Sequence, residues 1–201
     1  MEQSRKGFTL LELIAVIAII SIILASLVAG YARVQRAAMN STAQQLASQI
    51  ASAWSVYLLE NRTWPTGAEG WTSGMDANPC RLLGGGFEPT TDRAAKRYMD
   101  VDYPGMENVQ TEKSITVRYG LQDPWGERLA KQGRLRDAAE HRMMFALDLN
   151  YDGVIDSDDC GEIPSGIEIR ATACAWSWGE KGRSAASKTK EFFQRLPCKS
   201  W

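Results

Sequence analysis

The chain reads Lys6-Gly7-Phe8-Thr9-Leu10-Leu11-Glu12 near its N-terminus, and an uncharged run from Leu13 to Ala29 follows. Between Phe8 and Ala32, Glu12 is the only charged residue in the sequence. A helix needs about 20 predominantly apolar residues to cross the hydrocarbon of a bilayer. The stretch therefore predicts a membrane-spanning helix over residues 8–32, with one carboxylate near its start.

The length of this run argues against a cleaved secretory signal peptide. A signal peptide has an apolar core of about 7–15 residues, followed by a small-residue cleavage site. Here the run is longer, and a helical pattern continues past it. A plain membrane anchor explains the run but not Glu12, because a carboxylate at the bilayer centre costs about 2.5–3.5 kcal/mol.

The residues around Gly7 resemble the leader and cleavage site of type IV pilins and type II secretion pseudopilins. The basic pair Arg5-Lys6 precedes the glycine, and Phe8 opens the apolar run. The resemblance implies that residues 1–7 are a leader, and that a prepilin peptidase cuts between Gly7 and Phe8. It further implies that Phe8 is N-methylated and that Glu12 takes part in assembly.

Glu12 has two interpretations. Its carboxylate would pair with the Phe8 amine of a neighbouring subunit, which offsets the desolvation of both charges. Alternatively, Glu12 lies close enough to the membrane interface to stay hydrated.

The basic Arg5 and Lys6 keep the leader cytoplasmic. We therefore expect a single-pass protein of the bacterial inner membrane, with its C-terminal head in the periplasm or in an envelope-spanning or surface filament.

The resemblance implies an α+β fold, the pilin fold, in which a long N-terminal helix packs on a small antiparallel β-sheet head. Apolar residues at helical spacing continue to about Asn61, so we expect one helix of about 50 residues from Phe8. Pro65 would end it, because the residue before a proline disfavours helix. The head would span residues 33–201, of which 33–65 are helical.

The rest of the head divides into two regions. Residues 66–113 are rich in Gly, Pro, Asp and Asn, which predicts a variable loop region with a short helical piece at 92–99. Residues 114–201 are expected to form the sheet. Asp123-Pro124-Trp125-Gly126 resembles a pseudopilin motif and predicts a turn with a buried tryptophan; a catalytic Asp123 has no support. The predicted strands are 114–119, 142–147 and 167–178.

Four cysteines lie beyond the membrane segment, and none forms a Cys-x-x-Cys pair, which argues against zinc. In an exported head, an even number is compatible with two disulfides. Three pairings are possible and the sequence does not choose among them; buried free thiols are the alternative. The candidates are Cys80, Cys160, Cys174 and Cys198.

An acidic loop, residues 148–159, has the donor spacing of a calcium-binding loop. Oxygen-bearing side chains occupy positions one, three, five, nine and twelve, and Gly153 occupies the sixth. Major pseudopilins are similar in holding calcium in a loop of this region. The alternative is a solvated acidic turn. The predicted ligands are Asp148, Asn150, Asp152, the carbonyl of Val154, Asp156 and Asp159.

The resemblance implies a structural subunit of a homo-oligomeric helical filament, assembled with other pseudopilins or pilins, and not an enzyme. The single histidine, His141, has no nucleophile context near it in the sequence. No basic tract is long enough to suggest nucleic acid, and the net charge is −1. Two alternatives remain: an anchored enzyme, and a minor pilin whose region 66–113 forms a surface binding or adhesion module.

Overall fold

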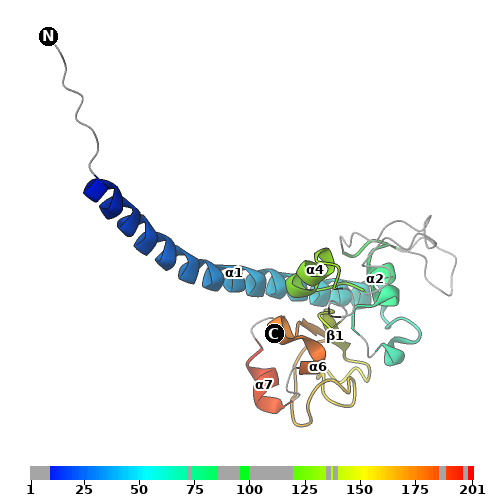
Figure 1. Cartoon of the computed structure of the whole chain (residues 1–201). Coiled ribbons are helices and arrows are strands. Elements are labelled where there is room, and N and C mark those ends of the chain that lie inside the picture. The colour runs from blue at the N-terminus through cyan, green and yellow to red at the C-terminus, as the bar shows by residue number, and fades with distance from the viewer. Residues whose placement is uncertain are drawn as a thin grey trace. The chain divides into compact units, whose positions relative to one another are not determined.

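The computed structural model describes residues 10–71, 74–85, 96–99, 120–134, 137, 140–185, 189–196 and 199–201. The chain divides into two compact units, residues 1–38 and residues 39–201. One helix, α1 (Leu10–Asn61), contributes to both units (Figure 1). This confirms the prediction of a single long N-terminal helix ahead of a head with α and β structure.

The described part of the first unit, Leu10–Ala38, is helical throughout. None of its described side chains is buried, and Leu10, Ile22 and Leu27 are 76%, 71% and 61% exposed. A continuous apolar surface of this size marks a site of contact with a membrane or with another protein. By length and composition, α1 is able to cross a membrane.

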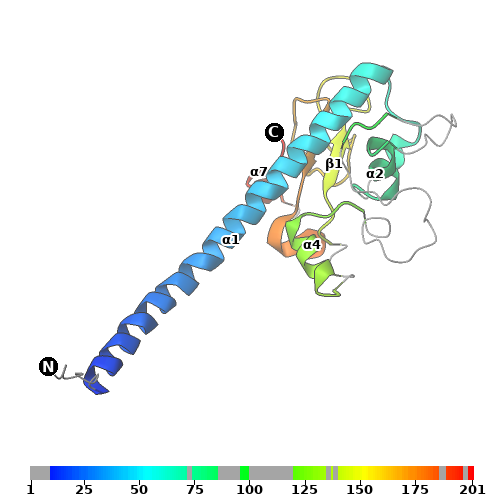
Figure 2. The same ribbon diagram turned by 90° about the horizontal axis from the view of Figure 1, so that it is seen from above.

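In the second unit, α1 has one buried face. Buried side chains recur every three or four residues, which is the repeat of one helix face. Ala43 packs against Trp125, and the others cluster with residues of the first strand, β1 (Met144–Leu147); Figure 2 shows this part of α1 passing beside β1. The helix ends at Asn61, after which Arg62 adopts a left-handed φ of 63°. The buried residues are Ala43, Ala47, Ile50, Ala53, Trp54 and Tyr57.

Within the residues that the structure describes, the sheet has two antiparallel strands, β1 (Met144–Leu147) and β2 (Ala173–Trp176). Met144 lies opposite Trp176, and Leu147 lies opposite Ala173. Every residue of both strands is buried, because each face of the sheet is covered. Phe145, Leu147, Ala173 and Ala175 pack with α1, whereas Met144, Ala146, Cys174 and Trp176 pack on the opposite side.

Short helices complete the described part of the head. Asp76 caps the start of α2 by accepting a hydrogen bond from the Asn78 N–H. On the sheet face away from α1, Phe193 of α7 contacts the Trp176 ring at a centroid distance of 5.3 Å. The helices are η1 (Ala68–Gly70), α2 (Ala77–Leu83), α4 (Pro124–Lys131), η3 (Gly179–Lys181), α6 (Gly182–Ala185) and α7 (Lys190–Gln194).

The predicted strands were too long. Strand β1 begins at Met144, two residues later than expected, and Arg142 forms only an isolated bridge with Gln122. Strand β2 covers the last part of the predicted 167–178, and Ile169 forms a bridge with Ile155 outside it. The predicted strand 114–119 lies outside the described residues.

Two local predictions were wrong. Asp123-Pro124-Trp125-Gly126 does not form a turn but starts helix α4, although Trp125 is buried as expected, at 8% exposure. Of the predicted helical piece 92–99, the described part, residues 96–99, is not helical. Its Arg97 forms a bridge with Gly84, and the Tyr98 N–H donates to the Leu83 carbonyl.

Candidate functional site: the apolar helix and the acidic loop

The apolar part of α1 carries the first candidate site. Glu12 lies in the first turn of the described helix, and its side chain is exposed. Gly7 and Phe8, the residues of the predicted cleavage site, lie outside the described residues.

The second candidate site is the acidic loop, which begins directly after β1. Asp148 is 3% exposed, and both of its carboxylate oxygens accept hydrogen bonds from the loop backbone. Oδ1 accepts from the Asp152 N–H at 3.1 Å, and Oδ2 accepts from the Gly153 N–H at 2.9 Å. Gly153 has a φ of +84°, a conformation that glycine adopts without strain. The chain therefore turns at Gly153, the sixth position of the loop, in a conformation that suits glycine.

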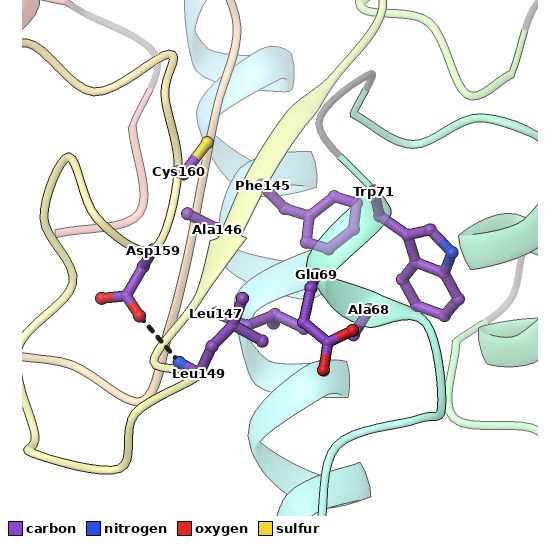
Figure 3. A pocket seen from close by; sticks show the side chains of 9 residues that line it. All are labelled: Ala68, Glu69, Trp71, Phe145, Ala146, Leu147, Leu149, Asp159 and Cys160. Carbon is purple, nitrogen blue, oxygen red and sulfur yellow. Dashed lines mark hydrogen bonds between the residues drawn. The ribbon is translucent and has the colours of Figure 1, made fainter.

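The far end of the loop folds back onto its beginning. Asp159 Oδ1 accepts from the Leu149 N–H at 3.0 Å, shown as the dashed line in Figure 3, and Oδ2 accepts from the Asp156 N–H at 3.3 Å. Burial raises the pKa of the Asp159 carboxyl above its usual range, although these two N–H groups oppose the change. The nearby charges of Asp148 and Asp156 raise this pKa further.

Trp64, in the segment that follows α1, connects this segment to the loop. Its indole N–H donates to the carbonyl of Asp148 at 2.5 Å, and its backbone N–H donates to the Tyr151 hydroxyl at 2.9 Å. The Trp64 and Tyr151 rings stack at a centroid distance of 6.5 Å. This contact was not predicted, because the two aromatic residues are 87 positions apart in the chain.

The loop meets only half of the requirement for a calcium site. Its donors are all oxygens, which suits calcium, and the residues present could supply six of them. However, within the described residues no group of three or more His, Cys, Asp or Glu side chains converges to hold a metal ion. Asp148 and Asp159 instead face the loop's own N–H groups. The calcium prediction therefore stays a prediction.

A small cavity lies beside the loop (Figure 3). Its volume is about 20 Å³, which is room for about one water molecule and too small for an organic substrate. Its polar lining comes from the side chains of Glu69, Asp159 and Cys160. The remaining lining residues are Ala68, Trp71, Phe145, Ala146, Leu147 and Leu149.

A buried polar cluster joins Asp123, His141 and Ser177, which was also not predicted. The Ser177 hydroxyl donates to Asp123 Oδ2, and His141 Nδ1 lies 3.6 Å from Asp123 Oδ1. The carboxylate therefore lies between the hydroxyl and the imidazole. A catalytic triad instead requires the histidine in the middle, where it can take the serine proton. The cluster is fully or almost fully buried, so we interpret it as structural.

Three of the four cysteines lie in the described residues, and all three are buried free thiols in this structure. Burial raises the pKa of the Cys80 thiol to about 12. Burial also raises the pKa of the Cys174 thiol, and the next largest contribution comes from nearby Cys160. Cys198 lies outside the described residues, so the prediction of two disulfides is not confirmed.

Comparison with known proteins identifies one segment. Residues 3–28 match the family model described as the prokaryotic N-terminal methylation motif. This motif is a signal of type IV pilins and pseudopilins, so the N-terminal segment of the chain is type IV pilin-like. It points to a structural subunit that is processed by prepilin peptidase and anchored in a membrane. Neither the curated proteins nor the solved structures give a match.

Proposed function

We propose that the chain is a pseudopilin of a type II secretion system, which polymerises through its N-terminal helix into a pilus-like filament. The observation that carries the proposal is the match of residues 3–28 to the methylation motif, followed by an unburied apolar helix. A surface of this kind needs a lipid or protein partner. The membrane would cover it before assembly, and the packed helices of neighbouring subunits would cover it in the filament.

In this proposal, a prepilin peptidase in the inner membrane removes residues 1–7, and Phe8 becomes the methylated N-terminus. The basic Arg5 and Lys6 hold the leader in the cytoplasm, which places the head in the periplasm. Cleavage turns the backbone nitrogen of Phe8 into a cationic amine. This creates a positive charge four residues before the carboxylate of Glu12.

The new amine and the carboxylate of Glu12 would set the register between subunits. An unpaired charge at the centre of the bilayer costs about 2.5–3.5 kcal/mol on insertion scales. Pairing with an opposite charge offsets part of this cost. When a subunit enters the filament, the Phe8 amine of one copy and Glu12 of its neighbour would offset this cost. The contact therefore favours one stacking of the helices over a sliding contact between apolar surfaces.

We further propose that the acidic loop binds calcium. The support is its oxygen-only donor set, its spacing and the sharp turn at Gly153. Asp148, Asn150, Asp152, Asp156, Asp159 and the Val154 carbonyl would hold the ion, which would supply positive charge among carboxylates that otherwise repel one another. The ion would stabilise the head and has no part in a chemical reaction.

Filament assembly by variants of Glu12 tests the proposed function. We expect Glu12→Leu to give a processed chain that stays in the membrane and forms no filaments visible by electron microscopy. Ser21→Ala is the control on the same helix, because the Ser21 hydroxyl donates to the Ile17 carbonyl of its own helix, at 2.7 Å. Wild-type filament yield from Glu12→Leu would contradict the proposal.

A deletion strain distinguishes a pseudopilin from a minor pilin with a surface binding role. Loss of the protein should abolish secretion of exported enzymes into the medium if the chain is a pseudopilin. Loss of cell adhesion or twitching, with secretion intact, would instead favour a minor type IV pilin.

A further inference from the structure

The two-stranded sheet separates the described cysteines. Cys80 of α2 is buried with Phe145 and the other residues on the α1 side of the sheet. Cys160 and Cys174 are buried together on the opposite side. Because alternate side chains of a strand point to opposite faces, a bond from Cys80 to Cys174 of β2 would have to pass through the sheet.

On their shared side, Cys160 and Cys174 are brought together by Ala146 of β1. Cys174 lies directly opposite Ala146 in the antiparallel register. Cys160 and Ala146 line the same small cavity, and Figure 3 shows them next to each other.

Hydrogen bonds hold the two ends of the acidic loop, residues 148–159, close to β1 and β2. The Asp148 N–H donates to the Thr172 carbonyl at 3.0 Å, which aligns the start of the acidic loop with β2. Asp159 accepts from the Leu149 N–H, which returns the end of the loop to the same place. Cys160 therefore follows a residue that is tied to the chain next to β1.

We propose that Cys160 and Cys174 form a disulfide in the mature protein and thereby attach the end of the acidic loop to β2. The proposal rests on the proposed export of the head, since disulfides persist in oxidising compartments. The two thiols lose two protons and two electrons to a disulfide-bearing oxidant, which is reduced to two thiols by exchange. Cys160 and Cys174 are 5% and 0% exposed, so exchange takes place before the loop closes during folding.

The pairing is tested on the full-length chain, refolded in detergent with oxidised and reduced glutathione. The product is alkylated under denaturing, non-reducing conditions, and its peptides are mapped by mass spectrometry. We expect one linked peptide pair that contains Cys160 and Cys174. Free alkylated Cys160, or its linkage to Cys80 or Cys198, would overturn the proposal.

Variants give a second measurement that does not depend on peptide mapping. A reductant should lower the melting temperature of the wild type and of Cys80→Ser by several degrees, because a disulfide limits the freedom of the unfolded chain. It should not change that of the double variant Cys160→Ser with Cys174→Ser. An unchanged wild type, or an equal decrease in the double variant, would overturn the pairing.

The redox state in cells separates this proposal from the export on which it rests. Protein isolated from native membranes after rapid alkylation should contain the same linked pair. If the linkage forms in glutathione but both thiols are free in cells, the pairing holds and the proposed export of the head is wrong. If it forms in neither case, the pairing itself is wrong.

Discussion

The Ser177 hydroxyl donates a hydrogen bond to the Asp123 carboxylate, 54 positions away in the chain, and both side chains are fully buried. The other oxygen of Asp123 accepts from the N–H groups of Trp125 and Gly126, at 3.0 and 2.9 Å. One carboxylate therefore caps α4 and ties it to the segment after β2. The Gly179 N–H extends this connection by donating to the Ser177 hydroxyl at 2.9 Å.

Replacing this carboxylate should destabilise the head. Asp123→Ala removes the α4 cap and leaves the buried Ser177 hydroxyl without its acceptor, so we expect a loss of about 2–4 kcal/mol. Urea unfolding of the full-length chain in detergent, followed by tryptophan fluorescence, measures it, because all 7 tryptophans lie in residues 39–201. The exposed Asp137→Ala is the control and should change stability by about 0.5 kcal/mol or less. Equal midpoints for the two variants would contradict this role.

Trp54 is the centre of the core between α1 and the sheet. It is fully buried and stacks on Phe145 of β1 at a centroid distance of 5.2 Å. We expect Trp54→Ala to cost about 3–5 kcal/mol, because it leaves a large cavity. Leu59→Ala is the control on the same helix, since Leu59 is 67% exposed. The same urea titration applies, and an unfolding midpoint for Trp54→Ala within error of that of Leu59→Ala would refute the packing.

Calcium should raise the melting temperature of the wild type relative to chelator. At a calcium concentration 100 times the dissociation constant, the stabilisation is about 2.7 kcal/mol, or roughly 5–10 °C for a head of this size. Asp148→Ala combined with Asp152→Ala should abolish the difference. Asp158→Asn, an exposed residue of the same loop that is not a predicted ligand, should retain it. A wild type that melts at one temperature in both conditions would end the calcium proposal.

The pair between Glu60 and Lys96 should make a pH-dependent contribution to stability. The hydrogen bond from Lys96 lowers the pKa of Glu60 from its ordinary value of 4.5. A lowered folded-state pKa contributes stability above the unfolded value, and this is lost as the pH falls through the folded value. The effect is small because both groups are exposed to solvent and screened.

Thermal unfolding of the wild type and of Glu60→Gln, at pH 7 and below pH 4, measures this contribution. The wild type should melt at the higher temperature at pH 7, and the difference should disappear at the lower pH. Glu191→Gln, on the exposed surface of α7, is the control. If the difference in melting temperature between the wild type and Glu60→Gln grows as the pH falls, the expected direction of the pH dependence is wrong.

The sequence predicted the elements that depend on local periodicity. Helix α1 follows from an apolar run and then a repeat of buried positions such as Ile50, Trp54 and Tyr57, and these signals need no tertiary information. The acidic loop was located correctly because its spacing is local as well. The direction of its carboxylates was not predictable. Local spacing does not decide whether Asp148 and Asp159 accept hydrogen bonds from the loop backbone or bind an ion.

The missed features depend on contacts between distant segments. The observed strands are shorter than the predicted ones. The pairing of β1 with β2, and not the β-branched composition around them, determines where the ladder ends. The cluster of Asp123, His141 and Ser177 joins three separate segments, so no local pattern reveals it. The start of α4 did leave a signal: an aspartate directly before a proline is a common N-cap followed by the first helical residue.

The mass of the mature N-terminus tests the central claim most directly. The full-length chain is produced together with a prepilin peptidase, isolated from membranes and analysed by intact and N-terminal peptide mass spectrometry. We predict a chain that begins with N-methylated Phe8, while Gly7→Ala stays uncleaved and Gly30→Ala, whose surroundings leave room for a methyl group, is processed normally. A wild-type chain that still begins at Met1 would contradict the account.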